Sequence, residues 1–113
     1  MSEKANCPCT ANCPLQAAME SVGGKWKTHI LCSLYVDGPI RYNHLKRKIQ
    51  GISNTMLANC LKELEQDGLV IRKEYLEVPV RVEYRTSSAS NDLIPILEQL
   101  AKWQTTRTLQ TNK

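Results

Sequence analysis

The chain has 113 residues, of which 15 are basic and 11 acidic, for a formal net charge of +4. A chain of this length folds as one domain with a modest core, and it leaves no room for a catalytic domain beside a regulatory one. No apolar run approaches the ~20 residues that cross a bilayer, and the N-terminal stretch M-S-E-K lacks the hydrophobic segment of a signal peptide. We therefore expect a cytoplasmic protein with no membrane partner.

The first predicted helix follows an N-terminal arm. Residues 1–12 hold two cysteines among small polar residues and show no apolar period, so we expect this arm to be mobile. Structure is predicted to begin at Cys13-Pro14, because proline suits the first turn of a helix. The apolar positions of this helix are Leu15, Ala18, Met19 and Val22. The glycine pair at 23–24 is expected to end it.

A second helix is predicted over 25–36, and the turn D-G-P at 37–39 closes it. A very short extended piece at 40–41 precedes a third helix over 43–49, which turns Leu45 and Ile49 inward. The inward residues of the second helix are Trp26, Ile30, Leu31 and Leu34.

Positive charge is concentrated in this part of the chain. Residues 25–50 hold six basic residues against one acidic residue, a local balance of +5 that exceeds the whole-chain value. They are Lys25, Lys27, Arg41, Lys46, Arg47 and Lys48 against Asp37. This region would attract a polyanion.

A fourth helix is marked at both ends. Ser53 is a good N-cap, and Gly68 provides the permissive backbone needed just after the last turn. At 100° per residue the packing face comprises Met56, Leu57, Cys60, Leu61 and Leu64. The outward face comprises Thr55, Ala58, Asn59, Lys62 and Gln66. Its small and amide side chains suit the narrow clearance of a DNA major groove, where asparagine can pair with adenine.

The third and fourth helices, joined through a glycine-containing turn, form a helix-turn-helix arrangement. Two strand-like runs at 69–74 and 80–85 form a hairpin, which is a candidate wing. A last helix over 91–106 carries more apolar surface than one small core needs, so part of it is expected to bury against another subunit. The residues after it, 107–113, are expected to be a flexible tail.

The order of these elements is that of a winged helix-turn-helix, and the sequence resembles the HxlR-type branch of MarR-like bacterial transcriptional regulators. The resemblance covers roughly residues 13–104. Its motifs are C-P-L-Q-A-A-M at 13–19, G-G-K-W-K at 23–27, I-L at 30–31, D-G-P-I-R-Y-N-H-L at 37–45, G-I-S-N-T-M-L at 51–57, L-K-E-L-E-Q-D-G-L-V at 61–70, V-P-V-R-V-E-Y at 78–84 and L-I-P-I-L at 93–97. The expected fold is therefore mainly α with a small β-hairpin, a winged helix-turn-helix over 13–106 with N- and C-terminal dimerisation helices.

The resemblance implies a homodimer that lays one recognition helix per subunit into the major groove and sets its wings along the flanking backbone or minor groove. It also implies sensing of oxidants, electrophiles or aldehydes through the cysteine before proline, here Cys13. The chain departs from the family pattern at 86–92, where Ser90 replaces a glycine and Ser87 can stand in as a cap. His29 and Cys32 also replace more usual residues.

Double-stranded DNA is thus the expected partner, and the candidate contacts fall into three groups. The fourth helix would meet base edges or adjacent phosphates, the basic stretch before it would meet phosphates, and the hairpin would add one arginine. The candidates are Ser53, Asn54, Thr55, Ala58, Asn59 and Lys62, then Arg41, Lys46, Arg47 and Lys48, and finally Arg81.

Cys13 is the candidate redox sensor, because the positive end of a helix dipole favours the reactive thiolate. Cys7 or Cys9 could resolve its oxidation product as a disulfide. The alternative is a soft metal held by these three cysteines with His29 or His44, but zinc sites more often space their pairs by two to four residues. We predict no metal and no cofactor.

An enzyme is not expected, because the sequence shows no phosphate-binding glycine loop, nucleophile elbow or paired carboxylate-histidine constellation. The remaining alternatives are a winged helix that responds to a metal or another small ligand, and one used for contact with another protein. The basic stretch beside the fourth helix favours DNA over the protein contact.

Overall fold

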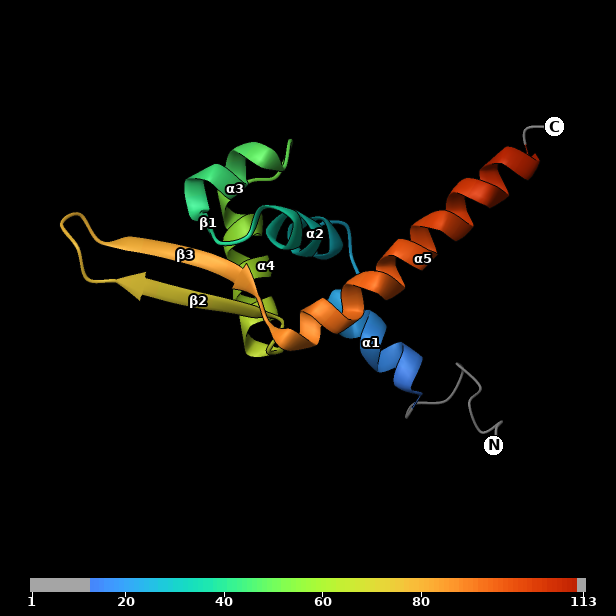
Figure 1. Ribbon diagram of the computed structural model, residues 1–113, viewed down its shortest axis with the longest axis horizontal. Coiled ribbons are helices and arrows are strands. Elements are labelled where there is room, and N and C mark those ends of the chain that lie inside the picture. Colours follow the sequence, from blue (N-terminus) through green and yellow to red (C-terminus); the bar gives the residue numbers. More distant parts are fainter. Residues whose placement is uncertain (1–12, 112–113) are drawn as a thin grey trace.

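The helices and strands follow the predicted order in the computed structural model, which describes residues 13–111 of the chain (Figure 1). The elements are α1 (Pro14–Val22), α2 (Lys27–Asp37), β1 (Ile40–Arg41), α3 (Tyr42–Lys48), α4 (Asn54–Gln66), β2 (Val70–Tyr75), β3 (Arg81–Thr86) and α5 (Ser88–Thr111). The fold is mostly helical with a small antiparallel sheet, which confirms the predicted winged helix architecture.

The sheet has three strands in the order β1-β3-β2, because the short β1 pairs with β3 of the hairpin. Ile40 lies opposite Tyr84 and Arg41 opposite Glu83. This pairing attaches the middle of β3 to the chain segment that enters α3. The wing and the helix-turn-helix are therefore parts of one body.

A single cluster of buried apolar side chains joins α2, α3, α4 and the sheet. Its members are Val22, Ile30, Leu31, Leu34, Ile40, Leu45, Ile49, Ile52, Leu57, Cys60, Leu61, Leu64 and Val70. Trp26 packs against this cluster, as its inward placement predicts, but it is only partly buried. Met56 was also expected to pack and is 42% exposed, so its assignment to the packing face was wrong.

The limits of α4 agree with the local sequence. The Ser53 hydroxyl accepts a hydrogen bond from the Met56 amide at 3.0 Å, as expected of an N-cap. Gly68 has a φ of 76° just past the last turn, and Gly51 has a φ of 87° in the turn between α3 and α4. Both positions need the left-handed backbone that glycine adopts without steric cost.

Helix α5 begins before the predicted range of 91–106 and ends after it. Ser87 caps it, since the Ser90 amide donates to the Ser87 hydroxyl at 3.3 Å. The helix then continues to Thr111, so the expected flexible tail over 107–113 is wrong for 107–111. No proline or glycine interrupts that stretch, which is why the helix has no local reason to stop at residue 106.

The first turn of α5 is bonded to the turn between α4 and β2. The Ser87 hydroxyl donates to the Gly68 carbonyl at 2.6 Å, and the fully buried Ser90 hydroxyl donates to the Leu69 carbonyl. A glycine at position 90 could not make the second bond. Serine in place of the family's glycine therefore gives this chain an additional link between α5 and the end of α4.

Helices α1 and α5 extend away from the body on the side opposite the hairpin (Figure 1). They expose apolar side chains, so Leu15 and Met19, which were placed on the apolar side of α1, are more than half exposed within the single chain. The exposed apolar residues of α5 are Ile96, Leu100, Trp103 and Leu109. Within residues 13–111, no helix has the length and apolar character needed to span a bilayer.

Candidate nucleic-acid interface

Helix α4 presents a continuous outward face of small, amide and basic side chains. Its members Asn54, Thr55, Ala58, Asn59 and Lys62 are all exposed. On the opposite side Leu57, Leu61 and Leu64 are at most 2% exposed, so the rotation of the helix about its axis is determined by the core. Because the core holds α4 in this orientation, the helix can present its outward face to a groove of DNA.

The N-terminus of α4 is also tied to α3. The Tyr42 hydroxyl at the start of α3 donates to the Asn54 carbonyl at 3.0 Å. The first turn of α4 contains the base-contact candidates, so this bond helps to fix their position relative to α3 and β1.

One carboxylate of α4 has a partner on α2. Lys27 Nζ lies 2.8 Å from Glu63 Oε1, and the Lys27 side chain is 11% exposed. The Glu63 side chain is 58% exposed, so only Lys27 would be left with a desolvated charge if its partner were removed. Lys27 belongs to the basic stretch of the sequence, but in the folded chain its ammonium pairs with a carboxylate of α4 and links α2 to α4.

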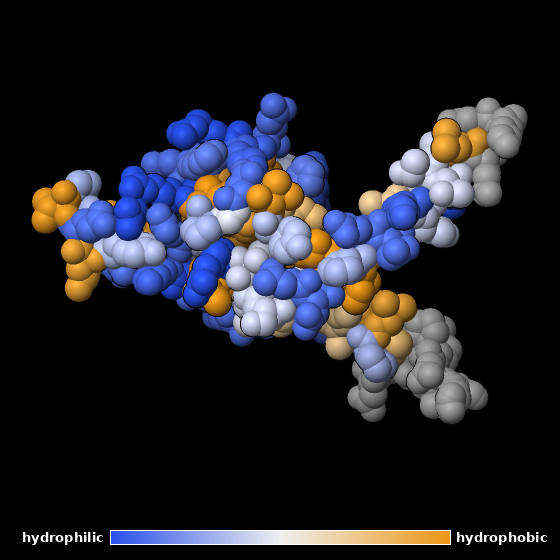
Figure 2. All heavy atoms as spheres, viewed as in Figure 1, coloured by the Kyte–Doolittle hydropathy of each residue, from blue (hydrophilic) through white to orange (hydrophobic). Residues whose placement is uncertain are grey.

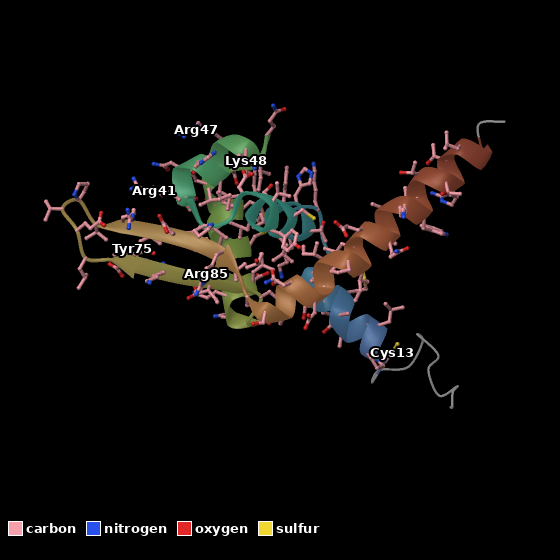
Figure 3. All side chains as sticks on the ribbon, in the orientation of Figure 1. Cys13, Arg41, Arg47, Lys48, Tyr75 and Arg85 are labelled. Atoms are coloured by element: carbon pink, nitrogen blue, oxygen red, sulfur yellow. The ribbon has the colours of Figure 1, made fainter. Side chains whose placement is uncertain are left out.

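A polar groove of about 650 Å³ lies between α3, β1 and β3. Its cationic lining comes from Arg41, Arg47 and Arg81, with His44 beside them and Glu83 as the carboxylate. Figure 3 shows Arg41 and Arg47 on the same side of the molecule, above the hairpin, and Figure 2 shows a strongly hydrophilic surface there. Three guanidinium groups around one groove suit the phosphate oxygens of a nucleic-acid backbone.

Two of the predicted phosphate contacts have carboxylate partners within the protein. Lys48 forms an ion pair with Asp37. Arg81 lies 3.2 Å from Glu77 and 3.5 Å from Glu83, and its guanidinium stacks on the Tyr75 ring at 4.0 Å. Part of the charge of these two residues is already compensated.

The other predicted cations differ from these two. Arg41, Lys46, Arg47 and Lys62 have no carboxylate partner among residues 13–111. Their positive charge is therefore available to an external anion. Arg41 and Arg47 stand out because both also line the groove.

Two cations of the sheet, Lys73 and Arg85, were not among the predicted contacts. In the β2–β3 register Lys73 lies opposite Glu83 and Arg85 opposite Ile71, so both share the sheet face that carries Arg41. The core residue Ile40 and its partner Tyr84 belong to the other face. The alternation of side chains along a strand could have identified this set, once the register was known.

The cysteines have different environments. Cys13 is the N-cap residue of α1, as predicted, but it is only 4% exposed. Cys32 is exposed on α2, where burial of the sulfur and then the nearby Glu98 raise the pKa of its thiol. Cys60 is buried on α4 as predicted, and burial raises the pKa of its thiol. Cys7 and Cys9 lie outside the described residues.

Known proteins share this arrangement. A family model described as HxlR-like helix-turn-helix matches residues 21–112. An uncharacterized HTH-type transcriptional regulator of Halalkalibacterium halodurans is 48% identical over 90 residues, which are 80% of each chain. The redox regulator HypR in its oxidized form is 36% identical with a TM-score of 0.76, over 83% of this chain and 96% of that one. The reduced form of the regulator YodB from Bacillus subtilis is 35% identical with a TM-score of 0.74, over 80% and 89%.

Proposed function

The chain belongs to the HxlR-like helix-turn-helix family and is a transcriptional regulator of the helix-turn-helix type, and on this premise we propose that its homodimer reads an operator in double-stranded DNA through α4. The observation that carries the proposal is the outward face of α4, small and amide-rich, beside a groove lined by Arg41 and Arg47. Amide side chains can recognise base edges, whereas arginines at the backbone position the protein.

Helix α4 and the basic residues beside it contribute differently to DNA binding. The outward and C-terminal parts of α4 carry Lys62 against Glu63, Glu65 and Asp67, so the helix alone cannot supply the attraction to DNA. Pairing of Glu63 with Lys27 reduces that negative charge without reversing it. We assign most of the affinity to Arg41, Lys46 and Arg47, and the choice of sequence to Asn54, Thr55, Ala58 and Asn59, with Ser53 and Lys62 at the edges.

A homodimer is supported by the apolar side chains that α1 and α5 leave exposed. Monomeric proteins rarely expose apolar patches of this kind without a partner. An apolar groove of about 480 Å³ between α2 and α5, lined by Cys32, Leu97, Leu100 and Trp103, adds to the surface that a second subunit can cover.

We further propose that oxidation at Cys13 changes operator binding. One support for this proposal is the position of Cys13 at the start of α1. The other is the similarity of the chain to HypR and YodB, of which HypR is described as a redox regulator. With diamide as oxidant, Cys13 and Cys7 or Cys9 lose two electrons and two protons, an S–S bond forms, and diamide is reduced to the hydrazine. Because Cys13 is 4% exposed, whatever covers its thiol must move before the thiol reacts.

The test is a gel shift on the DNA upstream of the protein's own gene, with and without diamide. We expect the wild-type protein to bind at low salt, and diamide to change its affinity by about 5- to 150-fold in a way that dithiothreitol reverses. Cys13→Ser should bind as tightly as the reduced protein and ignore diamide.

Cys32→Ser is the matched control, because Cys32 is exposed but its pKa is raised, so it should respond to diamide like the wild type. Absence of a shift at low salt would refute DNA binding on this fragment. A Cys13→Ser protein that still responds to diamide would refute the sensor and leave operator binding in place.

A further inference from the structure

The N-terminal half of the outward face of α4 carries no charge. Residues spaced i, i+3, i+4 and i+7 form one stripe along this face, and all of them are exposed: Thr55, Ala58, Asn59 and Lys62. Residues 54–61 contain no charged side chain, and α4 contains no arginine. The first two turns of α4 therefore present methyl groups, one hydroxyl and amides.

This composition is poorly suited to guanine. Arginine, which pairs with O6 and N7 together, is the commonest residue in contact with guanine in the major groove. The cation of the stripe, Lys62, lies in the C-terminal half of α4. Helix-turn-helix proteins contact base edges mainly through the N-terminal residues of the recognition helix. The bases that face the first turns of α4 are therefore expected to be ones that uncharged groups recognise.

Asn59 is the side chain of this face that can form two hydrogen bonds with one base. Its amide forms no hydrogen bond with any of residues 13–111, so its oxygen and its nitrogen are both available. Asn54 differs, because the Tyr42 hydroxyl lies 3.5 Å from its side-chain oxygen and donates to its carbonyl at 3.0 Å. An asparagine with both groups available accepts from N6 of adenine and donates to N7.

Thr55 and Ala58 add methyl groups on the same side of the helix as Asn59. In the major groove, apolar side-chain atoms recognise thymine through its 5-methyl group. Residues 55 to 59 rise about 6 Å along the helix axis, which corresponds to about two base pairs. The amide and the two methyl groups would thus meet the same short run of base pairs.

Resting on the operator binding proposed above, we propose that α4 selects A·T pairs at the centre of each operator half-site. Asn59 pairs with adenine through both groups of its amide, and the methyl groups of Thr55 and Ala58 contact the 5-methyl group of thymine. Asn59 is then the residue that determines the preferred base, while the arginines beside α3 hold the DNA backbone.

The test is selection of duplexes from a random pool by the full-length wild type and by the variants Asn59→Ala and Asn59→Arg. Anisotropy titrations then give the affinities for individual duplexes. Gln66→Ala is the matched control, because Gln66 is an exposed amide on the same helix, two turns beyond Asn59.

We expect the wild type to select half-sites with A·T pairs at their centre. Replacing the adenine that faces Asn59 with guanine should weaken wild-type binding by about 10- to 100-fold. Asn59→Ala should bind the two duplexes almost equally, and Asn59→Arg should prefer guanine. A gained preference for guanine cannot arise from a loss of stability. Gln66→Ala should keep the wild-type preference, and all variants should unfold at the wild-type temperature, because the substituted side chains are exposed.

Two base analogues test the individual contacts. 7-Deazaadenine lacks N7, so at the selected adenine it should weaken wild-type binding by roughly fivefold, the effect of one hydrogen bond, and leave Asn59→Ala binding unchanged. Uracil lacks the methyl group of thymine, so at the selected thymine it should weaken wild-type binding by about fourfold. The same uracil should affect Thr55→Ser less than the wild type.

A wild-type preference for G·C pairs at the centre of the half-site would overturn this assignment and leave operator binding in place. An Asn59→Ala protein that keeps the adenine preference, or that loses as much affinity as the wild type on 7-deazaadenine, would also overturn it. If the wild type selects no duplex at all, the proposed operator binding itself fails.

Discussion

Replacing Leu57 with alanine is expected to lower the free energy of unfolding by about 3 kcal/mol. Leu57 is fully buried on the inner side of α4, so the shorter side chain leaves a cavity as well as losing apolar contact. Domains of this size have only ~5–15 kcal/mol of stability, so the loss is a large fraction of the total. Urea unfolding followed by circular dichroism, at one protein concentration, measures it.

Met56→Ala is the control for this experiment, because Met56 precedes Leu57 on the same helix and is 42% exposed. Its loss should stay below about 1 kcal/mol. Comparable losses in the two variants would mean that the core does not determine the rotation of α4, and the outward face described above would lose its physical basis.

The double variant Arg41→Gln/Arg47→Gln is expected to bind DNA on the order of a hundredfold more weakly at 100 mM salt. Both arginines line the groove beside α3 and lack a carboxylate partner among the described residues. A dimer would lose four phosphate contacts, so the slope of log K against log salt should become shallower by roughly 3.6. Anisotropy titrations across a salt series measure both quantities.

The matched control removes two exposed charges outside the groove, through Arg72→Gln on the opposite face of the sheet and Lys102→Gln on α5. It should lower the affinity far less and leave the salt slope nearly unchanged, because long-range attraction between exposed charges is screened within about 10 Å. If the two double variants weaken binding equally, net charge alone would explain the attraction, and the groove would have no special part in it.

The local sequence was sufficient to locate α4 and its faces. The serine cap at 53, the glycine at 68 and the apolar period between them are short-range features that act within one or two turns. The burial of Leu57, Cys60, Leu61 and Leu64 follows from that period. The prediction that Met56 is buried was wrong because this residue lies at the border of the apolar stripe. At such a position the neighbouring elements determine whether the side chain is covered.

The arrangement of the candidate interface could not be predicted in the same way, because it depends on contacts between residues that are distant in sequence. The pairing of β1 with β3 joins residues more than forty positions apart, and it brings Arg41 next to Arg81. The partners of Arg81, Lys48 and Lys27 likewise follow from the folded chain, and they separate compensated cations from available ones. A count of basic residues cannot make this distinction, because it treats all of them as equal.

The most direct test of the account is the affinity of the full-length protein for a duplex selected from a random pool, compared with a scrambled duplex of the same composition, from 50 to 200 mM salt. The selected duplex is expected to be bound at least a thousandfold more tightly than the scrambled one. With about eight phosphates contacted, affinity should fall on the order of ten-thousandfold across the series. Equal affinity for both duplexes, or binding that is insensitive to salt, would contradict it.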